Sequence, residues 1–324
     1  MSTVKNYLSL VKFSHTIFAL PFAMIGFFLG IFNGIKVIYG VGQWNLHKAI
    51  EWEEERNKSR LDSLFDNDEA RATFTHLIIL FLLVILCMIF ARSAAMAFNR
   101  YLDKSFDAKN RRTAIREIPA GILKANNVLI FTIVSCILFI ICTFFINKLC
   151  FYLSPIALAV VLGYSYTKRF TPLCHLILGL GLSFAPIGAY LAVTGQFSLL
   201  PIIFSFIVLF WVSGFDIIYA LQDEEFDKEN KLYSIPAALG KKNALTVSRI
   251  LHALSAACVV FAAVGGNFGL WYWIGAAMFG GLLIYQHILV KPNDLKKVNL
   301  AFFTTNGIAS VVFAIFVIVD LFIN

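Results

Sequence analysis

Residues 74–91 read FTHLIILFLLVILCMIFA, an uncharged and almost wholly apolar run of the length that a helix needs to cross a bilayer. Of the 324 residues, 59% are hydrophobic and only 14% are charged, too few charges to cover a water-facing surface. The sequence therefore predicts an all-α integral membrane protein of about nine transmembrane helices, with eight or ten as alternatives, in a single domain over residues 1–324. The other predicted spans lie at about 14–35, 126–147, 149–167, 173–194, 197–215, 245–267, 268–290 and 300–323.

The first apolar run predicts a membrane span and not a cleavable signal peptide, since it contains Pro21 and lacks a small-residue cleavage site after it. The run at 245–267 is the weakest, because Arg249 and His252 interrupt its start. Six cysteines lie in or beside apolar runs without a CxxC pair, a pattern typical of small buried hydrophobic residues.

Basic residues concentrate in alternate loops, which accounts for the net charge of +8 without a nucleic-acid partner. Residues 98–125 hold seven lysines and arginines, whereas the short loops near 148, 196 and 267 hold only Lys148. This positive-inside pattern predicts that the N-terminus and the even-numbered loops face the cytoplasm. Residues 36–73, with six basic and eight acidic residues, form a polar insertion that nine spans would place outside.

Two acidic clusters follow the second and sixth predicted spans. The first reads FNRYLDKSFDAKNRRTAIREIPAG (98–121), and its Asn99, Asp103 and Asp107 share one face of a predicted helix. The second reads GFDIIYALQDEEFDKENKLYSIPAALG (214–240). Its corresponding helix face carries Asp216, Tyr219, Asp223 and Asp227.

The two clusters are related by position, because Asp103 and Asp107 precede Asp223 and Asp227 by the same 120 residues. Four predicted spans separate them, and an even number of crossings returns the chain to the same side of the membrane. This arrangement predicts a parallel internal duplication of about four helices, with the two clusters as halves of one site.

Carboxylates that converge at a membrane boundary repel one another and require a cation. Mg²⁺ fits, since it binds through one or two carboxylates together with substrate phosphates. The basic side chains near the clusters would complete a phosphate cradle, although Lys–Arg pairs at span ends are commonly topology anchors. The cradle residues are Arg112, Arg116, Lys168 and Arg169. Together with the large apolar body, this pattern favours a lipid diphosphate as substrate.

At these residues the sequence resembles the UbiA superfamily of intramembrane aromatic prenyltransferases, and its opening VKFSHTIFALPFA (11–23) resembles the 4-hydroxybenzoate-type branch. The family pattern NxxxDxxxD matches 99–107 and is followed by RTxxR at 112–116. YxxxKR matches 164–169, and DxxYAxxDxxxD matches 216–227 with Ser-Ile-Pro at 234–236. The first motif departs from the best-known members, which have aspartate where this chain has Arg100.

The resemblance implies nine helices in a ring around a central cavity, and transfer of a polyprenyl group from its diphosphate to a small aromatic acid, 4-hydroxybenzoate above others, in quinone biosynthesis. It implies Mg²⁺ as cofactor, no obligate protein partner and, since the first motif resembles a bacterial branch, a place in the bacterial cytoplasmic membrane with the active site facing the cytoplasm. The expected metal ligands are Asn99, Asp103, Asp107, Asp223 and Asp227, and the expected diphosphate ligands are Arg112, Arg116, Lys168 and Arg169.

In this scheme the ring of Tyr219 stabilises an allylic cation and Asp216 orients or deprotonates the acceptor. Alternatives are a naphthoate acceptor for menaquinone, a haem-type acceptor, and, in another class, a cation-coupled transporter, whose ionisable groups would lie near the bilayer midplane.

Overall fold

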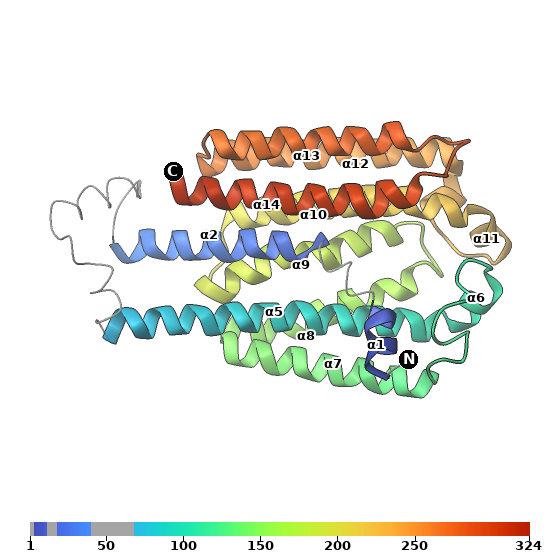
Figure 1. The fold of residues 1–324 in the computed structure, drawn as a ribbon, viewed down its shortest axis with the longest axis horizontal. Coiled ribbons are helices and arrows are strands. Elements are labelled where there is room, and N and C mark those ends of the chain that lie inside the picture. Colours follow the sequence, from blue (N-terminus) through green and yellow to red (C-terminus); the bar gives the residue numbers. More distant parts are fainter. Residues whose placement is uncertain (1–2, 12–17, 40–67) are drawn as a thin grey trace.

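The computed structural model describes residues 3–11, 18–39 and 68–324, and this part of the chain is helical, with no β-strand. A short helix, α1 (Thr3–Val11), crosses α5 near one end of a bundle of long helices (Figure 1). The long helices are α2 (Leu20–Tyr39), α5 (Asp68–Leu102), α7 (Ala125–Ile146), α8 (Lys148–Thr167), α9 (Cys174–Thr194), α10 (Leu199–Ala220), α12 (Ile235–Gly266), α13 (Leu270–Leu289) and α14 (Asn306–Ile323).

Eight helices of the described residues are long and apolar enough to cross a membrane, and α2 adds a ninth apolar helix whose described side chains span only Leu20–Phe32. The prediction of an all-α membrane protein with about nine spans is confirmed. Residues 14–17 of the first predicted span and residues 40–67 of the polar insertion lie outside the described part. The division into one domain with an insertion therefore stays a prediction.

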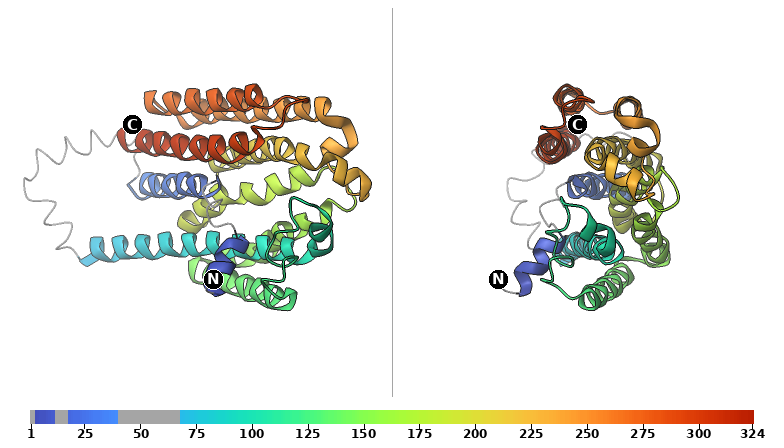
Figure 2. Two further views of the ribbon diagram at one scale, coloured as in Figure 1. Left: turned by 45° about the vertical axis from the view of Figure 1, so that its right-hand side comes forward. Right: turned by 90° about the vertical axis from the view of Figure 1, so that its right-hand side faces the viewer.

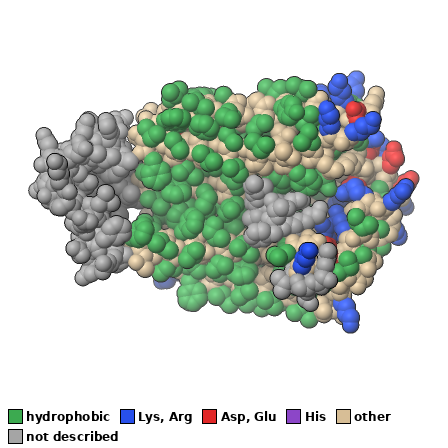
Figure 3. Space-filling model, viewed as in Figure 1, with side chains coloured by type: hydrophobic (Ala, Val, Ile, Leu, Met, Phe, Trp, Pro, Cys, Tyr) green, Lys and Arg blue, Asp and Glu red, His purple; other side chains and the backbone are tan. Residues whose placement is uncertain are grey.

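The long helices run side by side along the long axis of the molecule (Figures 1 and 2). Apolar side chains cover their flank, and lysines and arginines gather at the end where the short helices α6 (Lys104–Lys109) and α11 (Glu224–Glu229) lie (Figure 3). An apolar flank suits lipid, because a helix satisfies its own backbone hydrogen bonds and leaves only side chains to meet the hydrocarbon.

An aromatic core joins α2 to the second half of the bundle. Trp211 of α10 is fully buried, and its ring centroid lies 5.3 Å from that of Phe22 and 5.8 Å from that of Phe279. Gly26 of α2 lies against the backbone carbonyl of Pro186 in α9, at a distance that leaves no room for a Cβ atom. These contacts hold α2, α9 and α10 together on one side of the site.

The helix pattern repeats with the spacing of the acidic clusters. The six-residue helices α6 and α11 begin 120 residues apart, and each follows a long membrane helix. A glycine in the left-handed region then precedes the next long helix body, Gly121 with φ of 72° in the first half and Gly240 with φ of 75° in the second. The structure thus agrees with the predicted parallel duplication, and both clusters lie at one end of the bundle.

Candidate active site

The backbone turns at the middle aspartate of each cluster. Asp103, between α5 and α6, has φ and ψ of −89° and 7°, and Asp223, which ends the short 3₁₀ helix η2 (Leu221–Asp223), has −105° and 6°. The prediction that each cluster lies on one continuous helix was therefore wrong. Hydrogen bonds of the i→i−4 type persist through the first turn, from Asp103 N to Asn99 O at 2.9 Å and from Asp107 N to Asp103 O at 2.7 Å. Because these hydrogen bonds continue across Asp103, the i, i+4 spacing of the acidic residues does not reveal the bend.

All eleven predicted site residues line one cavity of about 290 Å³ between α5, α8, α9, α10 and the connecting segments at their ends. The two clusters, far apart in sequence, therefore form one site. The predicted residues in its wall are Asn99, Asp103, Asp107, Arg112, Arg116, Lys168, Arg169, Asp216, Tyr219, Asp223 and Asp227.

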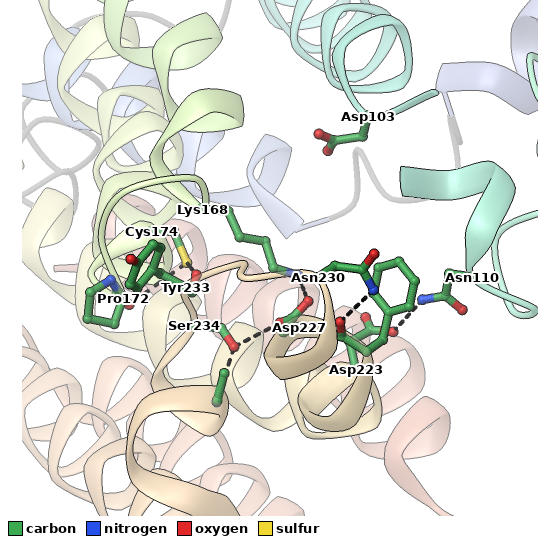
Figure 4. A network of polar contacts seen from close by, with 12 residues as sticks. Asp103, Asn110, Lys168, Pro172, Cys174, Asp223, Asp227, Asn230, Tyr233 and Ser234 are labelled. Carbon is green, nitrogen blue, oxygen red and sulfur yellow. Dashed lines mark hydrogen bonds and ion pairs between the residues drawn. The ribbon is translucent and has the colours of Figure 1, made fainter. Parts of the chain in front are cut away.

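Four ion pairs join the predicted metal ligands to the predicted diphosphate ligands. Arg112 binds Asp223 with two nitrogens, Nε to Oδ1 at 3.2 Å and Nη2 to Oδ2 at 2.5 Å. The other three pairs are Arg116–Asp107 at 2.6 Å, Lys168–Asp227 at 2.7 Å and Arg169–Asp103 at 3.4 Å. Figure 4 shows Lys168 directed at Asp227, with Asp103 on a separate element above them. Each carboxylate is thus neutralised by a base of the same cavity.

Burial and charge shift the pKa values of groups at this end of the bundle. Burial, reinforced by the nearby Asp107 carboxylate, raises the pKa of Asp103 above its ordinary value. Burial disfavours the charged forms of Arg112 and Lys168, but the carboxylates of Asp223 and Asp227 more than offset it, and the pKa of each base is raised. Arg112 and Lys168 are therefore cationic, whereas burial disfavours the charged form of Asp103.

Asp227 is anchored by the start of the next helix. It is fully buried, and its Oδ2 accepts a hydrogen bond of 2.8 Å from Ser234 Oγ (Figure 4). Ser234 is also the N-cap of α12, where its Oγ accepts from Ala237 N at 3.2 Å, and Pro236 lies in the first turn. The Ser-Ile-Pro sequence thus both starts α12 and orients the Asp227 carboxylate.

Asp216 pairs with a histidine to which the sequence assigned no site role. His175 Nδ1 lies 2.7 Å from Asp216 Oδ2, and the imidazole is buried. On its other side, His175 Nε2 lies 3.4 Å from the backbone N–H of Ile235, which can only donate. We assign the proton to Nδ1 on this ground, so that His175 donates to the Asp216 carboxylate.

Aromatic rings form the wall next to these charges. Tyr219 accepts a hydrogen bond of 3.0 Å from Arg112 Nη1, and its ring centroid lies 4.2 Å from that of Phe302. Phe302 and Phe303 belong to a π-helical turn, η3 (Leu300–Thr305), which leads into α14. The sequence identified Tyr219 but not its ring partners, because the π-helical turn leaves no mark in the apolar pattern of 300–323.

A second cavity of about 430 Å³ adjoins the polar one and is lined almost wholly by apolar side chains of α5, α7, α8 and α9. The two cavities share wall residues, among them Arg92, Met96 and Tyr164. Together they form a polar chamber at the end of the bundle and an apolar chamber beside it.

The oxygen ligands of this cavity suit a hard divalent cation whose remaining coordination positions are filled by a bound ligand. No three acidic, histidine or cysteine side chains among the described residues converge into a metal cage. Asp107, however, uses only Oδ1 for Arg116, and its buried Oδ2 has no hydrogen-bond partner in the described part of the chain. Carboxylate oxygens offered singly suit Mg²⁺, which takes one or two carboxylates and fills its shell with phosphate and water.

Asn110 joins the two halves of the site and was missed by the sequence analysis. Its side-chain amide donates to Asp223 Oδ1 at 3.2 Å, and its Oδ1 accepts from the backbone N–H of Arg112 at 2.9 Å. Its position between the first acidic cluster and Arg112 was the only signal, and that signal does not distinguish it from an ordinary turn residue.

Comparisons with known proteins agree with this geometry. A family model described as the UbiA prenyltransferase family matches residues 70–308. The 4-hydroxybenzoate octaprenyltransferase of Aliivibrio fischeri (strain MJ11) is 26% identical over 238 residues, which cover 74% of this chain and 82% of the relative. The protein of that name from Aeromonas salmonicida (strain A449) is 30% identical over 226 residues, which cover 68% and 76%.

Solved structures share the fold. The apo structure of a UbiA homolog from Aeropyrum pernix K1 superposes with a TM-score of 0.74 at 25% identity, over 94% of this chain and 98% of that one. A UbiA homolog from Archaeoglobus fulgidus bound to GPP and Mg²⁺ gives a TM-score of 0.65 at 17% identity, over 98% and 99%. The helical architecture is therefore shared with these solved UbiA homologs.

Proposed function

The chain belongs to the UbiA prenyltransferase family, and on that premise we propose that it transfers a polyprenyl group from its diphosphate to 4-hydroxybenzoate in quinone biosynthesis, with Mg²⁺ as cofactor. One observation carries the proposal: eleven residues from two halves of the sequence line one polar cavity, and an apolar chamber adjoins it. A lipid diphosphate has a charged head that suits the polar cavity and an apolar tail that suits the adjoining chamber. Relatives named 4-hydroxybenzoate octaprenyltransferase and a fold neighbour bound to GPP and Mg²⁺ support the choice of substrates and metal.

Binding would begin with an exchange of partners in the polar cavity. The bases that pair with the aspartates, such as Arg112 with Asp223, can turn to phosphate oxygens, and the released carboxylates become available to a cation. Asn99, Asp103, Asp107, Asp223 and Asp227 would hold Mg²⁺, which offsets negative charge on the departing diphosphate. The prenyl tail would lie in the apolar chamber, where it leaves water.

In the reaction the allylic C–O bond breaks, and its electron pair leaves with the diphosphate. Arg112, Arg116, Lys168 and Arg169 stabilise that charge, and the ring faces of Tyr219 and Phe302 stabilise the allylic cation left behind. A ring carbon of the acceptor forms the new C–C bond, and Asp216, oriented by His175, takes the proton that this carbon loses.

The membrane orientation belongs to the same proposal. We infer that the cavity opens toward the cytoplasm of a bacterial cell, since lysines and arginines gather at that end of the molecule (Figure 3). The alternative of a cation-coupled transporter finds no support, because the two acidic clusters lie on and beside α6 and α11, at one end of the bundle (Figure 1).

The test is an assay of the purified full-length protein in detergent. It would receive Mg²⁺, prenyl diphosphates of increasing length, and 4-hydroxybenzoate, a dihydroxynaphthoate or haem, with products identified by mass spectrometry. We expect prenylated 4-hydroxybenzoate, lost when EDTA removes the metal. A prenylated naphthoate or haem alone would replace the proposed acceptor, and folded protein without any product would contradict the proposal.

Variants connect the reaction to this cavity. Asp103→Ala and Asp223→Ala should abolish turnover and leave a folded protein, because each removes a carboxylate of the proposed metal site. Glu225→Ala is the matched control, since Glu225 is an exposed acid of α11 outside the cavity wall. Full activity in both aspartate variants would refute the site assignment.

A further inference from the structure

Arg100 is a buried base that the mechanism above does not use. It lies in the last turn of α5, one residue after Asn99, and only 3% of it is exposed. It lines the polar cavity, and its Nε has no hydrogen-bond partner among the described residues. A buried guanidinium normally meets an anion or several acceptors, because burial removes the water that would otherwise solvate it.

The carboxylates of the cavity are already engaged by other bases. Asp103, Asp107, Asp223 and Asp227 pair with Arg169, Arg116, Arg112 and Lys168. Asp216 pairs with His175. Among the described residues of the wall, six lysines and arginines face five aspartates. The cavity thus holds an excess of positive charge, which favours an anionic ligand.

The charged groups that act on Arg100 are Arg116, Asp107 and Glu117. Of these, Asp107 is already bound through its Oδ1 to Arg116. Arg100 and Arg116 both line this cavity, and a shared anion would offset the repulsion between their charges. The N–H groups of a guanidinium suit phosphate and carboxylate oxygens, which they bind in pairs.

We propose that Arg100 is an oxyanion-binding residue of this cavity, which takes a phosphate oxygen of the prenyl diphosphate or the carboxylate of the aromatic acid. The proposal rests on the proposed function. The neighbouring Arg116 favours the phosphate oxygen, because both bases can then bind one diphosphate. Arg100 would thus add one more protein group that binds the substrate's negative charge.

The first measurement is binding of inorganic pyrophosphate to the full-length protein by calorimetry, with and without Mg²⁺, which requires no turnover. Arg100→Gln should weaken pyrophosphate binding by about ten- to a hundredfold, the loss expected for hydrogen bonds to a charged group. Arg100→Lys keeps the positive charge but loses the paired N–H donors of the guanidinium, so its pyrophosphate affinity should lie between those of Arg100→Gln and wild type. Arg111→Gln, an exposed neighbour outside the cavity wall, removes the same charge and should bind as wild type does.

A second measurement separates the two sources of the oxyanion. If Arg100 binds the acceptor, Arg100→Gln should leave pyrophosphate binding unchanged, raise the KM for 4-hydroxybenzoate about tenfold, and lose the preference for the acid over its amide. Unchanged pyrophosphate binding together with an unchanged KM and acid preference would overturn the role of Arg100. Wild-type protein that binds no pyrophosphate would instead contradict the proposed function itself.

Discussion

At the scale of single residues, the site depends on pairs in which one side chain sets the orientation of another. Asp216 is the clearest case, because the buried His175 holds one of its oxygens at 2.7 Å. The imidazole cannot turn freely, since its other nitrogen accepts from the backbone of Ile235. His175 is therefore a positioning residue for the proposed proton acceptor.

His175→Leu should lower kcat by about tenfold or more, within the range that a positioned base contributes, and leave the KM for the prenyl diphosphate unchanged. His175→Asn, which can still donate to Asp216, should recover part of the loss. His76→Leu is the control, since His76 is exposed on α5. An unchanged kcat in folded His175→Leu protein would show that Asp216 needs no partner.

At the scale of elements, both short helices that follow the membrane spans place acids in the cavity. α6 and α11 are only six residues long, too short to be stable alone, and are held by contacts made by their side chains. In α11 the anchor is Asp227, which meets Lys168 from the end of α8 and Ser234 from the start of α12. One carboxylate thus ties three segments together.

Ser234→Ala removes both the N-cap of α12 and a donor to Asp227. We expect a loss of about 1–2 kcal/mol in the free energy of unfolding, measured in detergent, and a fall in activity even at temperatures where the protein stays folded. Ser198→Ala is the matched control, because Ser198 occupies the N-cap of α10 without a side-chain cap bond. Equal effects of the two variants would show that the Asp227 contact is unimportant.

At the scale of the whole molecule, the duplication brings two halves of the chain to one end of the bundle. Residues from the first half, Asn110 and Arg112, bind Asp223 of the second half. Arg169, from the end of α8, reaches back to Asp103 at the end of α5. The charged site therefore exists only when both halves are packed, with its apolar chamber on one flank.

The proposed orientation can be tested on intact cells. Cysteine introduced as Lys231→Cys, exposed at the site end, should react with a membrane-impermeant maleimide only from the cytoplasmic side. Gln196→Cys, exposed in the short loop at the opposite end, should react only from outside, with wild-type labelling of the native cysteines subtracted. The reverse pattern would place the active site outside and contradict the positive-inside argument.

The sequence by itself predicted the membrane class, about nine spans, the duplication and eleven of the residues that line the cavity, because apolar run length and the spacing of Asp103, Asp107, Asp223 and Asp227 are local properties of the chain. Tertiary structure alone decided which charges meet. Arg112 pairs with Asp223, His175 with Asp216, and the ring of Phe302 packs on that of Tyr219, and each contact joins residues more than 40 positions apart. Such contacts depend on how helices pack and where the backbone turns at Asp103 and Asp223, and neither leaves a periodic mark in the sequence.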